Sequence, residues 1–191
     1  MATALGCLTI IAAIVLLALI LTPTLHAARA QASAADVTLL NAANRDRAAA
    51  GLAPLQWDNA LAAAAHQHAL LMAQRNALSH QFLGEPPMQD RARHAGARFS
   101  LIAENVAEGP TVAGLHTQWM NSPPHRANLL DRELNAVGIA AVQSGGQWFA
   151  AEDFSAAVAL LGLDAQELQV SSQLAARGVR LLNATDDAQD L

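Results

Sequence analysis

The sequence predicts an α+β domain in which helices cover both faces of a small antiparallel sheet. Helical periodicity dominates residues 36–76, a strand-like apolar stretch occupies residues 100–109, and Gly145-Gly146 separates two further strand-like stretches. Each of these elements has one face to bury, so they pack in layers around a shared core. The 191 residues, of which 14% are charged, suffice for one such domain with an extension at each end.

The first 30 residues predict export. No charged residue precedes Arg29, and the apolar run ends at Pro23. The small residues around Arg29 fit a signal-peptidase site that would release a chain beginning at Gln31. The run is nearly as long as the roughly 20 residues of a membrane-spanning helix, and no basic residue precedes it. Residues 1–30 are therefore a signal peptide, which gives a periplasmic or extracellular protein, or else an N-terminal membrane anchor.

Composition excludes two classes of function. The formal net charge is -5 and no basic patch stands out, so nucleic acid is not an expected partner. The single cysteine, Cys7, lies in the leader. We therefore expect neither disulfides nor thiol chemistry in the exported domain.

Two helices open the domain. Val37, Leu40 and Ala43 recur at helical spacing before Gly51, which ends the first helix. Asp58 is a typical N-cap for the second helix, over residues 59–77. The predicted buried face of this second helix comprises Leu61, Ala64, Ala65, His68 and Met72. A loop with a short helical turn near residues 89–94 follows.

The strand at residues 100–109 carries the most informative residue, Glu104. Ile102, Glu104 and Val106 share one face of the strand. Both faces are mostly apolar, which predicts an interior strand. A carboxylate buried there must be paired or bound to a metal. The alternative is a strand at the sheet edge, where Glu104 reaches water.

Cap and turn residues predict the remaining elements. Residues 111–121 are helical, and Ser122-Pro123 begins a further short helix with His125 in its first turn. Gly145-Gly146 supplies the turn of a β-hairpin. Residues 156–191 form a C-terminal extension that we expect to be partly helical and weakly attached to the domain.

Histidine is the natural partner for Glu104, and two of the seven histidines are candidates. His80 and His125 lie at element boundaries, where functional side chains are often placed. His68 instead lies on the apolar face of its helix, which is typical of a packed, hydrogen-bonded residue. The other histidines carry no comparable signal.

Six stretches of the chain form an ordered set: "LLNAANRDRAAAGLAPLQWDNALAAAAHQHALLM", "LSH", "RARHAG", "AENVAEG", "QWMNSPPHRANLL" and "NAVGIAAVQSGGQWFAAEDF". The set resembles the CAP superfamily of cysteine-rich secretory, antigen 5 and pathogenesis-related proteins, and in particular its bacterial SCP-like extracellular branch. Each stretch is modest alone, but the ordered set is specific and covers the domain, residues 36–155. The resemblance implies a three-layer α-β-α sandwich, in agreement with the layers predicted above.

The resemblance also implies a central cleft with two histidines and acidic residues that can bind a divalent metal. By position, His80 and His125 resemble the two histidines, and Glu104 resembles the glutamate of the family's "GEN" stretch. The fuller eukaryotic pattern has a second glutamate three residues after the tryptophan matched by Trp119, where this chain has Ser122. The remaining ligands predict weak binding of zinc or another divalent metal, with Ser122 also in the cleft.

Three functions are compatible with these residues. The leading interpretation is a non-enzymatic exported module that binds a small molecule, a lipid or a protein through the cleft, because the resemblance implies diverse activities and no common reaction. The first alternative is a metal-assisted hydrolase, because two histidines and one glutamate match a three-ligand zinc site with an open position for water. The second alternative is a structural cluster that only fixes its loops. Contact with a membrane is expected only through an uncleaved leader.

Overall fold

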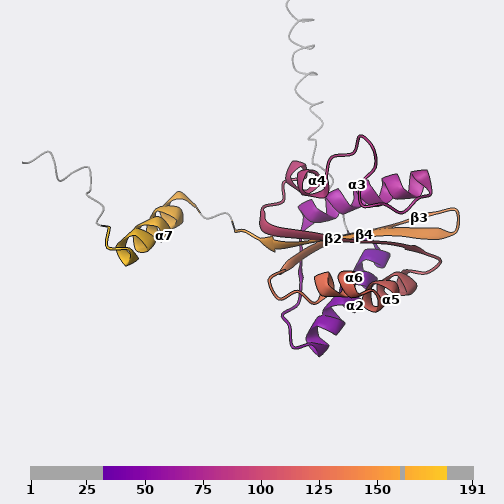
Figure 1. Ribbon diagram of the computed structural model, residues 1–191, viewed down its shortest axis with the longest axis horizontal. Helices are drawn as coiled ribbons and strands as arrows, with labels where there is room; N and C mark the ends of the chain where they lie inside the picture. The colour runs from indigo at the N-terminus through magenta and orange to yellow at the C-terminus, as the bar shows by residue number, and fades with distance from the viewer. Residues whose placement is uncertain (1–31, 160–161, 180–191) are drawn as a thin grey trace, which may run out of the picture.

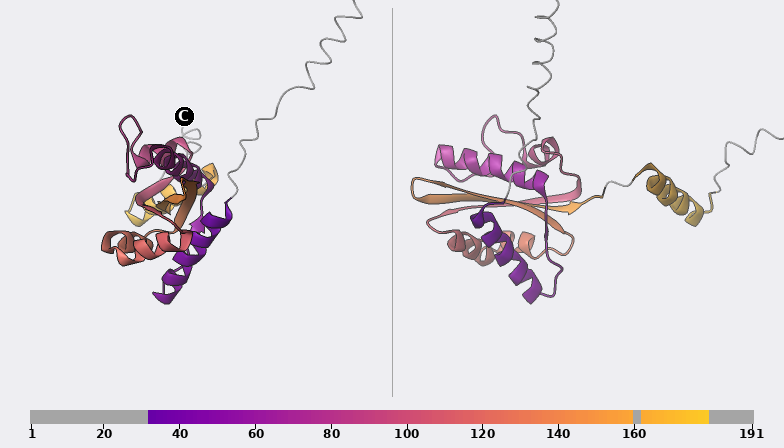
Figure 2. Two further views of the ribbon diagram at one scale, coloured as in Figure 1. Left: turned by 90° about the vertical axis from the view of Figure 1, so that its right-hand side faces the viewer. Right: turned by 180° about the vertical axis from the view of Figure 1, so that it is seen from behind.

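The computed structural model describes residues 32–159 and 162–179, so the predicted leader lies outside the described residues. The elements in chain order are α2 (Ala34–Ala49), β1 (Gln56–Trp57), α3 (Asn59–Arg75), α4 (Met88–His94), β2 (Phe99–Gly109), α5 (Val112–Asn121), α6 (Pro123–Leu129), β3 (Ala136–Ser144), β4 (Gln147–Ala157) and α7 (Leu163–Ala176). Figures 1 and 2 show the sheet between two helical layers, with α3 and α4 on one face and α2, α5 and α6 on the other. The α-β-α sandwich expected from the sequence is therefore confirmed.

The four-stranded sheet is mixed, with the order β1-β3-β4-β2. Strands β3 and β4 form the predicted antiparallel hairpin, which turns at Gly145 and Gly146 with φ angles of 57° and 81°. The short strand β1 pairs in parallel with β3. Sequence reasoning missed β1, because two residues are too few to show the alternation that identifies a strand.

Strand β2 lies at the edge of the sheet, so the prediction of an interior strand is wrong. It is the last strand in the sheet order and pairs with β4. Helices nevertheless cover both of its faces. Val106 packs in the core beneath α3, whereas Ala107 packs in the core beneath α5 on the opposite face. An edge strand covered on both faces has the same apolar pattern as an interior strand.

Helix α3 begins where the sequence predicts. Oδ1 of Asp58 accepts hydrogen bonds from the backbone N–H groups of Ala60 at 2.7 Å and Leu61 at 3.0 Å. The predicted buried face of α3, including His68, is buried. Gly138 of β3 allows the helix to approach the sheet, since a Cβ there would lie 1.9 Å from the backbone nitrogen of Ala62. A larger residue at this position would push α3 away from the sheet.

Helix α2 buries Ala43, one of the three residues whose spacing predicted the helix, together with residues outside that set. Leu39, Ala43 and Arg47 are buried, whereas Val37 is 43% exposed. The Arg47 guanidinium donates hydrogen bonds to four backbone carbonyls, those of Ala53, Leu129, Asp131 and Leu134. Apolar periodicity could not identify this face, because one of its members is a charged residue.

The C-terminal extension contains α7, none of whose side chains is buried. Figure 1 shows α7 apart from the sandwich. Its weak attachment to the domain stays a prediction. Within residues 32–159 and 162–179, no helix has the length and apolar character needed to cross a membrane.

Candidate functional site

Glu104 lies on β2, on the face covered by α3 and α4, and its side chain is only 4% exposed. Oε1 accepts a hydrogen bond from Nδ1 of His80 at 2.8 Å, and Oε2 accepts one from Nη2 of Arg91. Both carboxylate oxygens are thus held by donors, and one donor carries a permanent charge. The sequence allowed either a buried, paired Glu104 on an interior strand or a solvent-exposed Glu104 on an edge strand. Each alternative was right in one respect, because Glu104 lies on an edge strand but is buried and paired.

His80 lies in the loop between α3 and α4, and its side chain is 60% exposed. The hydrogen bond to Glu104 raises the pKa of His80 above its ordinary value of 6.5, and the negative charge of Glu104 adds to this effect. Partial burial and the positive charge of Arg91 oppose it. Since Nδ1 is bonded to Glu104, Nε2 is the ring nitrogen that remains for a ligand.

His125 lies in the first turn of α6, as predicted. Ser122 is the N-cap residue by position and Pro123 opens the helix, but the Ser122 side chain makes no capping hydrogen bond. Burial lowers the pKa of His125, and the charge of His80 lowers it further, so the two imidazoles interact electrostatically. In the described part of the chain, no hydrogen bond joins the His125 ring or Ser122 to Glu104. The inclusion of Ser122 in the site stays a prediction.

Sequence reasoning missed Arg91 and Glu85. Arg91, on α4, is buried and lies 3.5 Å from Oε1 of Glu85. Its Nη1 also donates to the backbone carbonyl of His80 at 3.2 Å, which fixes the loop that carries the candidate histidine. No spacing signal distinguishes Arg91 from its exposed neighbour Arg93.

Glu85 connects this arrangement to a second histidine. Its Oε1 lies 2.7 Å from Nδ1 of buried His68, whose Nε2 donates to the backbone carbonyl of Ser79 at 2.7 Å. His68 is therefore the packed, hydrogen-bonded histidine that the sequence predicts. The continuous set His68, Glu85, Arg91, Glu104 and His80 is called the ionic cluster below.

Asp153 of β4 is the register partner of Glu104 and is completely buried. Burial raises the pKa of Asp153 well above its ordinary value, and the negative charge of Glu104 raises it further. The positive charge of Arg91 acts in the opposite direction and lowers the pKa of Asp153.

Asn105 fixes α6 from the opposite face of β2. Its Nδ2 donates to the backbone carbonyl of His125 at 3.1 Å, and its Oδ1 accepts from Nδ2 of Asn128 at 2.9 Å. Burial raises the pKa of the adjacent Glu152 to about 8, although its hydrogen bond with Asn105 acts in the opposite direction. Adjacent residues of one strand thus anchor His80 from one layer and His125 from the other. His80, Glu104 and His125 at this sheet edge are called the histidine edge below.

The donor set does not form a ready metal site. Within the described residues, no group of three or more His, Cys, Asp and Glu side chains is placed to hold a metal ion. Both oxygens of Glu104 are engaged, and Arg91 places a positive charge beside them. A divalent ion bound by Glu104 would share its oxygens with His80 and Arg91.

Comparison with known proteins identifies similar sequences. The sequence pattern of the cysteine-rich secretory protein (CAP) family matches residues 40–158. YkwD of Bacillus subtilis (strain 168) is 30% identical over 128 residues, which cover 66% of this chain and 50% of YkwD. The membrane protein YlbC of the same organism is 30% identical over 105 residues, covering 53% of this chain and 30% of YlbC. The chain thus spans half of the length of YkwD and less than a third of the length of YlbC.

Solved structures show the same architecture. An extracellular SCP-domain protein of Bacillus anthracis is 28% identical, with a TM-score of 0.58 over 63% of this chain and 40% of that protein. An outer surface protein of Borrelia burgdorferi is 19% identical, with a TM-score of 0.61 over 67% of this chain and 96% of that protein. At this lower identity, the likeness to the Borrelia burgdorferi protein concerns the fold alone.

Proposed function

Because the chain belongs to the cysteine-rich secretory protein (CAP) family, we propose that it is an exported module that binds a ligand through the histidine edge without catalysing a reaction. The apolar leader supports export, as does the similarity to proteins described as extracellular or outer-surface. The ligand is a small molecule, a lipid or a protein that presents an oxygen acceptor to His80.

One observation carries this proposal: the ionic cluster is buried except for its outermost member, the solvent-exposed imidazole of His80. Burying Arg91 and Glu104 costs desolvation free energy, which their mutual attraction offsets only in good geometry. The outermost member of the cluster, His80, is 60% exposed. Glu104 also favours the protonated, hydrogen-bond-donating form of this ring. An exposed ring that is held in place by buried groups, and whose protonated form is favoured, is suited to bind a ligand oxygen.

The state of Glu104 supports binding rather than catalysis. A general base needs a carboxylate oxygen that can reach the proton to be removed. Both oxygens of Glu104 already accept hydrogen bonds, from His80 and Arg91. For the same reason we propose that zinc or another divalent metal binds weakly here, because the metal competes with donors already present.

Nuclear magnetic resonance of the histidine rings tests the proposal with two probes, zinc chloride and sodium acetate. We expect acetate to shift the His80 ring resonances and zinc to shift those of both His80 and His125. His80→Ala, Glu104→Gln and His125→Ala should each weaken zinc binding by at least about tenfold, the effect that losing even an outer-sphere partner can have on a metal site. His66→Ala is the matched control, since His66 is an exposed residue of α3.

Two outcomes would contradict the proposal. Equal zinc binding by all variants would place the metal elsewhere. No response of the His80 ring to either probe would favour the purely structural cluster.

A further inference from the structure

Helix α7 presents an apolar stripe to solvent. Leu163, Val170 and Leu174 are spaced by seven and four residues, so they lie on one face of the helix. No α7 side chain is buried. A 14-residue helix without tertiary contacts is marginally stable in water, and most helices in proteins depend on packing of an apolar face. The stripe therefore calls for a surface that covers it.

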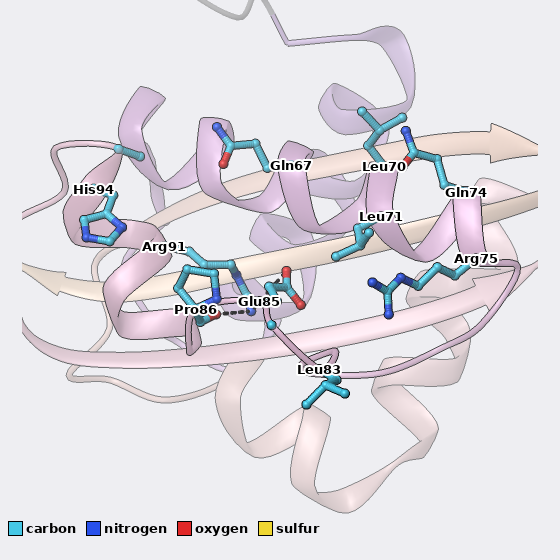
Figure 3. A pocket seen from close by; sticks show the side chains of 12 residues that line it. Gln67, Leu70, Leu71, Gln74, Arg75, Leu83, Glu85, Pro86, Arg91 and His94 are labelled. Atoms are coloured by element: carbon cyan, nitrogen blue, oxygen red, sulfur yellow. Dashed lines mark hydrogen bonds and ion pairs between the residues drawn. The ribbon is translucent and has the colours of Figure 1, made fainter.

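The sandwich offers such a surface in a groove of about 480 Å³ on its outer side, between α3, α4 and the loop that joins them. In Figure 3, Leu71 and Arg75 extend from α3 toward the loop that carries Leu83 and Pro86. Leu83 is 98% exposed, and Leu70 on the adjoining turn of α3 is also exposed. These exposed leucines give the groove apolar surface that a second element can cover.

We propose that α7 docks into this groove of its own domain, with the apolar stripe facing Leu71 and Leu83. The proposal goes beyond ligand binding at the histidine edge and does not depend on it.

Charge complementarity favours α7 as the occupant. The groove carries Arg75 and His94, and no ion pair of either side chain is found in residues 32–159 and 162–179. Its one carboxylate, Glu85, is already bonded within the ionic cluster. The first two turns of α7 carry Asp164 and Glu167 beside the stripe. Docking therefore sets carboxylates of α7 against the guanidinium of Arg75 at the rim of the groove.

The chain connection allows this contact within one molecule. The backbone N–H of Val158, which directly follows β4, donates to the carbonyl of Arg98 at 3.0 Å. Arg98 comes three residues after Ala95 in the chain, and Ala95 lines the groove. The end of β4 therefore lies close to the groove. Leu163 follows Val158 by five residues, which reach about 17 Å when extended. At 1.5 Å per residue, α7 is about 21 Å long, long enough to lie along the groove.

The groove also adjoins the ionic cluster, since Glu85 and Arg91 belong to both. Arg91 lines the groove, and the same guanidinium binds Glu104. A docked α7 would cover the outer side of the ionic cluster.

Disulfide trapping tests the proposal in the full chain. A Cys7→Ser background removes the only native thiol. Leu83→Cys combined with Val170→Cys should form an intramolecular disulfide in dilute protein, seen as a monomer of altered electrophoretic mobility. Leu83→Cys with Leu168→Cys should react about tenfold more slowly, because Leu168 lies on another face of α7 and a disulfide requires Cα atoms within about 7 Å.

A matched pair of charge substitutions separates docking from chance collision. Leu174→Asp should slow the Leu83–Val170 disulfide by about tenfold, since it places a charge in the apolar contact, whereas Leu168→Asp should leave the rate unchanged. Hydrogen exchange on the chain without engineered cysteines should show protected α7 amides that lose protection in Leu174→Asp alone. Equal rates for both cysteine pairs, unprotected α7 amides, or disulfides formed only between molecules would each overturn docking within one chain.

Discussion

Two imidazole–carboxylate pairs share Arg91 but differ in their access to solvent. In the pair of His68 and Glu85 both side chains are buried, whereas in the pair of His80 and Glu104 only the carboxylate is. The nitrogen–oxygen distances are similar, 2.7 Å and 2.8 Å, so the bond itself does not separate the two pairs.

The second ring nitrogen makes the difference. Nε2 of His68 is hydrogen-bonded to the carbonyl of Ser79. No partner for Nε2 of His80 is found in the described part of the chain, and this ring is exposed. A pair with both nitrogens satisfied can contribute only to structure, whereas an open pair can also bind. Arg91 contacts both carboxylates. The sealed pair, His68 and Glu85, therefore helps to fix the position of the open pair, His80 and Glu104.

The largest expected effect comes from breaking this connection with Arg91→Met. The substitution removes the guanidinium that both buried carboxylates, Glu85 and Glu104, contact, and removal of one member of a buried ion pair typically costs about 3–5 kcal/mol. The free energy of unfolding, measured in urea at pH 7, should fall by this amount. Arg93→Met is the control on the same helix: its pair with Asp90 is exposed, and its loss should cost less than about 1 kcal/mol. Equal effects of the two substitutions would show that Arg91 does not hold the pairs together.

The sequence predicted the individual helices and strands better than it predicted which of them pack against one another. The Asp58 cap, the buried face of α3 and the two-glycine hairpin are local features, and the structure confirms them. The prediction that β2 is an interior strand was wrong, and helical spacing did not identify the buried residues Leu39 and Arg47 of α2. Both depend on groups distant in sequence, namely the helices that cover β2 and the carbonyls that Arg47 binds.

The same limit applies to the site. A buried carboxylate such as that of Glu104 requires a partner, and the resemblance to the CAP superfamily identified His80 as a candidate. The structure places the His80 ring in hydrogen-bond contact with Glu104. Glu85 and Arg91 could not be identified, because an ion pair between separate elements leaves no periodic pattern in the sequence. The contact between His116 and Asp46, 2.6 Å apart on α5 and α2, was missed for the same reason.

An intermediate effect should distinguish the two histidines directly. His68→Ala leaves a cavity and removes the imidazole partner of Glu85, so we expect a loss of about 2–3 kcal/mol in the free energy of unfolding. His80→Ala removes an exposed ring, and the loss should stay below about 1 kcal/mol. Zinc binding, measured by calorimetry, should be lost in His80→Ala and retained in folded His68→Ala. If His68→Ala cost no more stability than His80→Ala, the distinction between a sealed and an open pair would fail.

The smallest effect concerns the pH at which the two edge histidines titrate. Nuclear magnetic resonance should find the pKa of His80 above 6.5 and that of His125 below it, because Glu104 favours the charged form of His80 while burial disfavours that of His125. The raised pKa of His80 means that its contribution to stability is complete below pH 6.5 and is lost as the pH rises through the folded-state pKa. The lowered pKa of His125 means that its contribution is present above pH 6.5 and is lost as the pH falls through the folded-state pKa. Each contribution should remain below about 1 kcal/mol, because both rings are partly solvated.

The variant Glu104→Gln tests the cause of the shift. It should return the pKa of His80 toward 6.5, whereas the titration curve of the exposed His66 should be the same in the variant and the wild type. A His80 pKa that is insensitive to Glu104→Gln would mean that the hydrogen bond between the two side chains does not control the charge of the open ring.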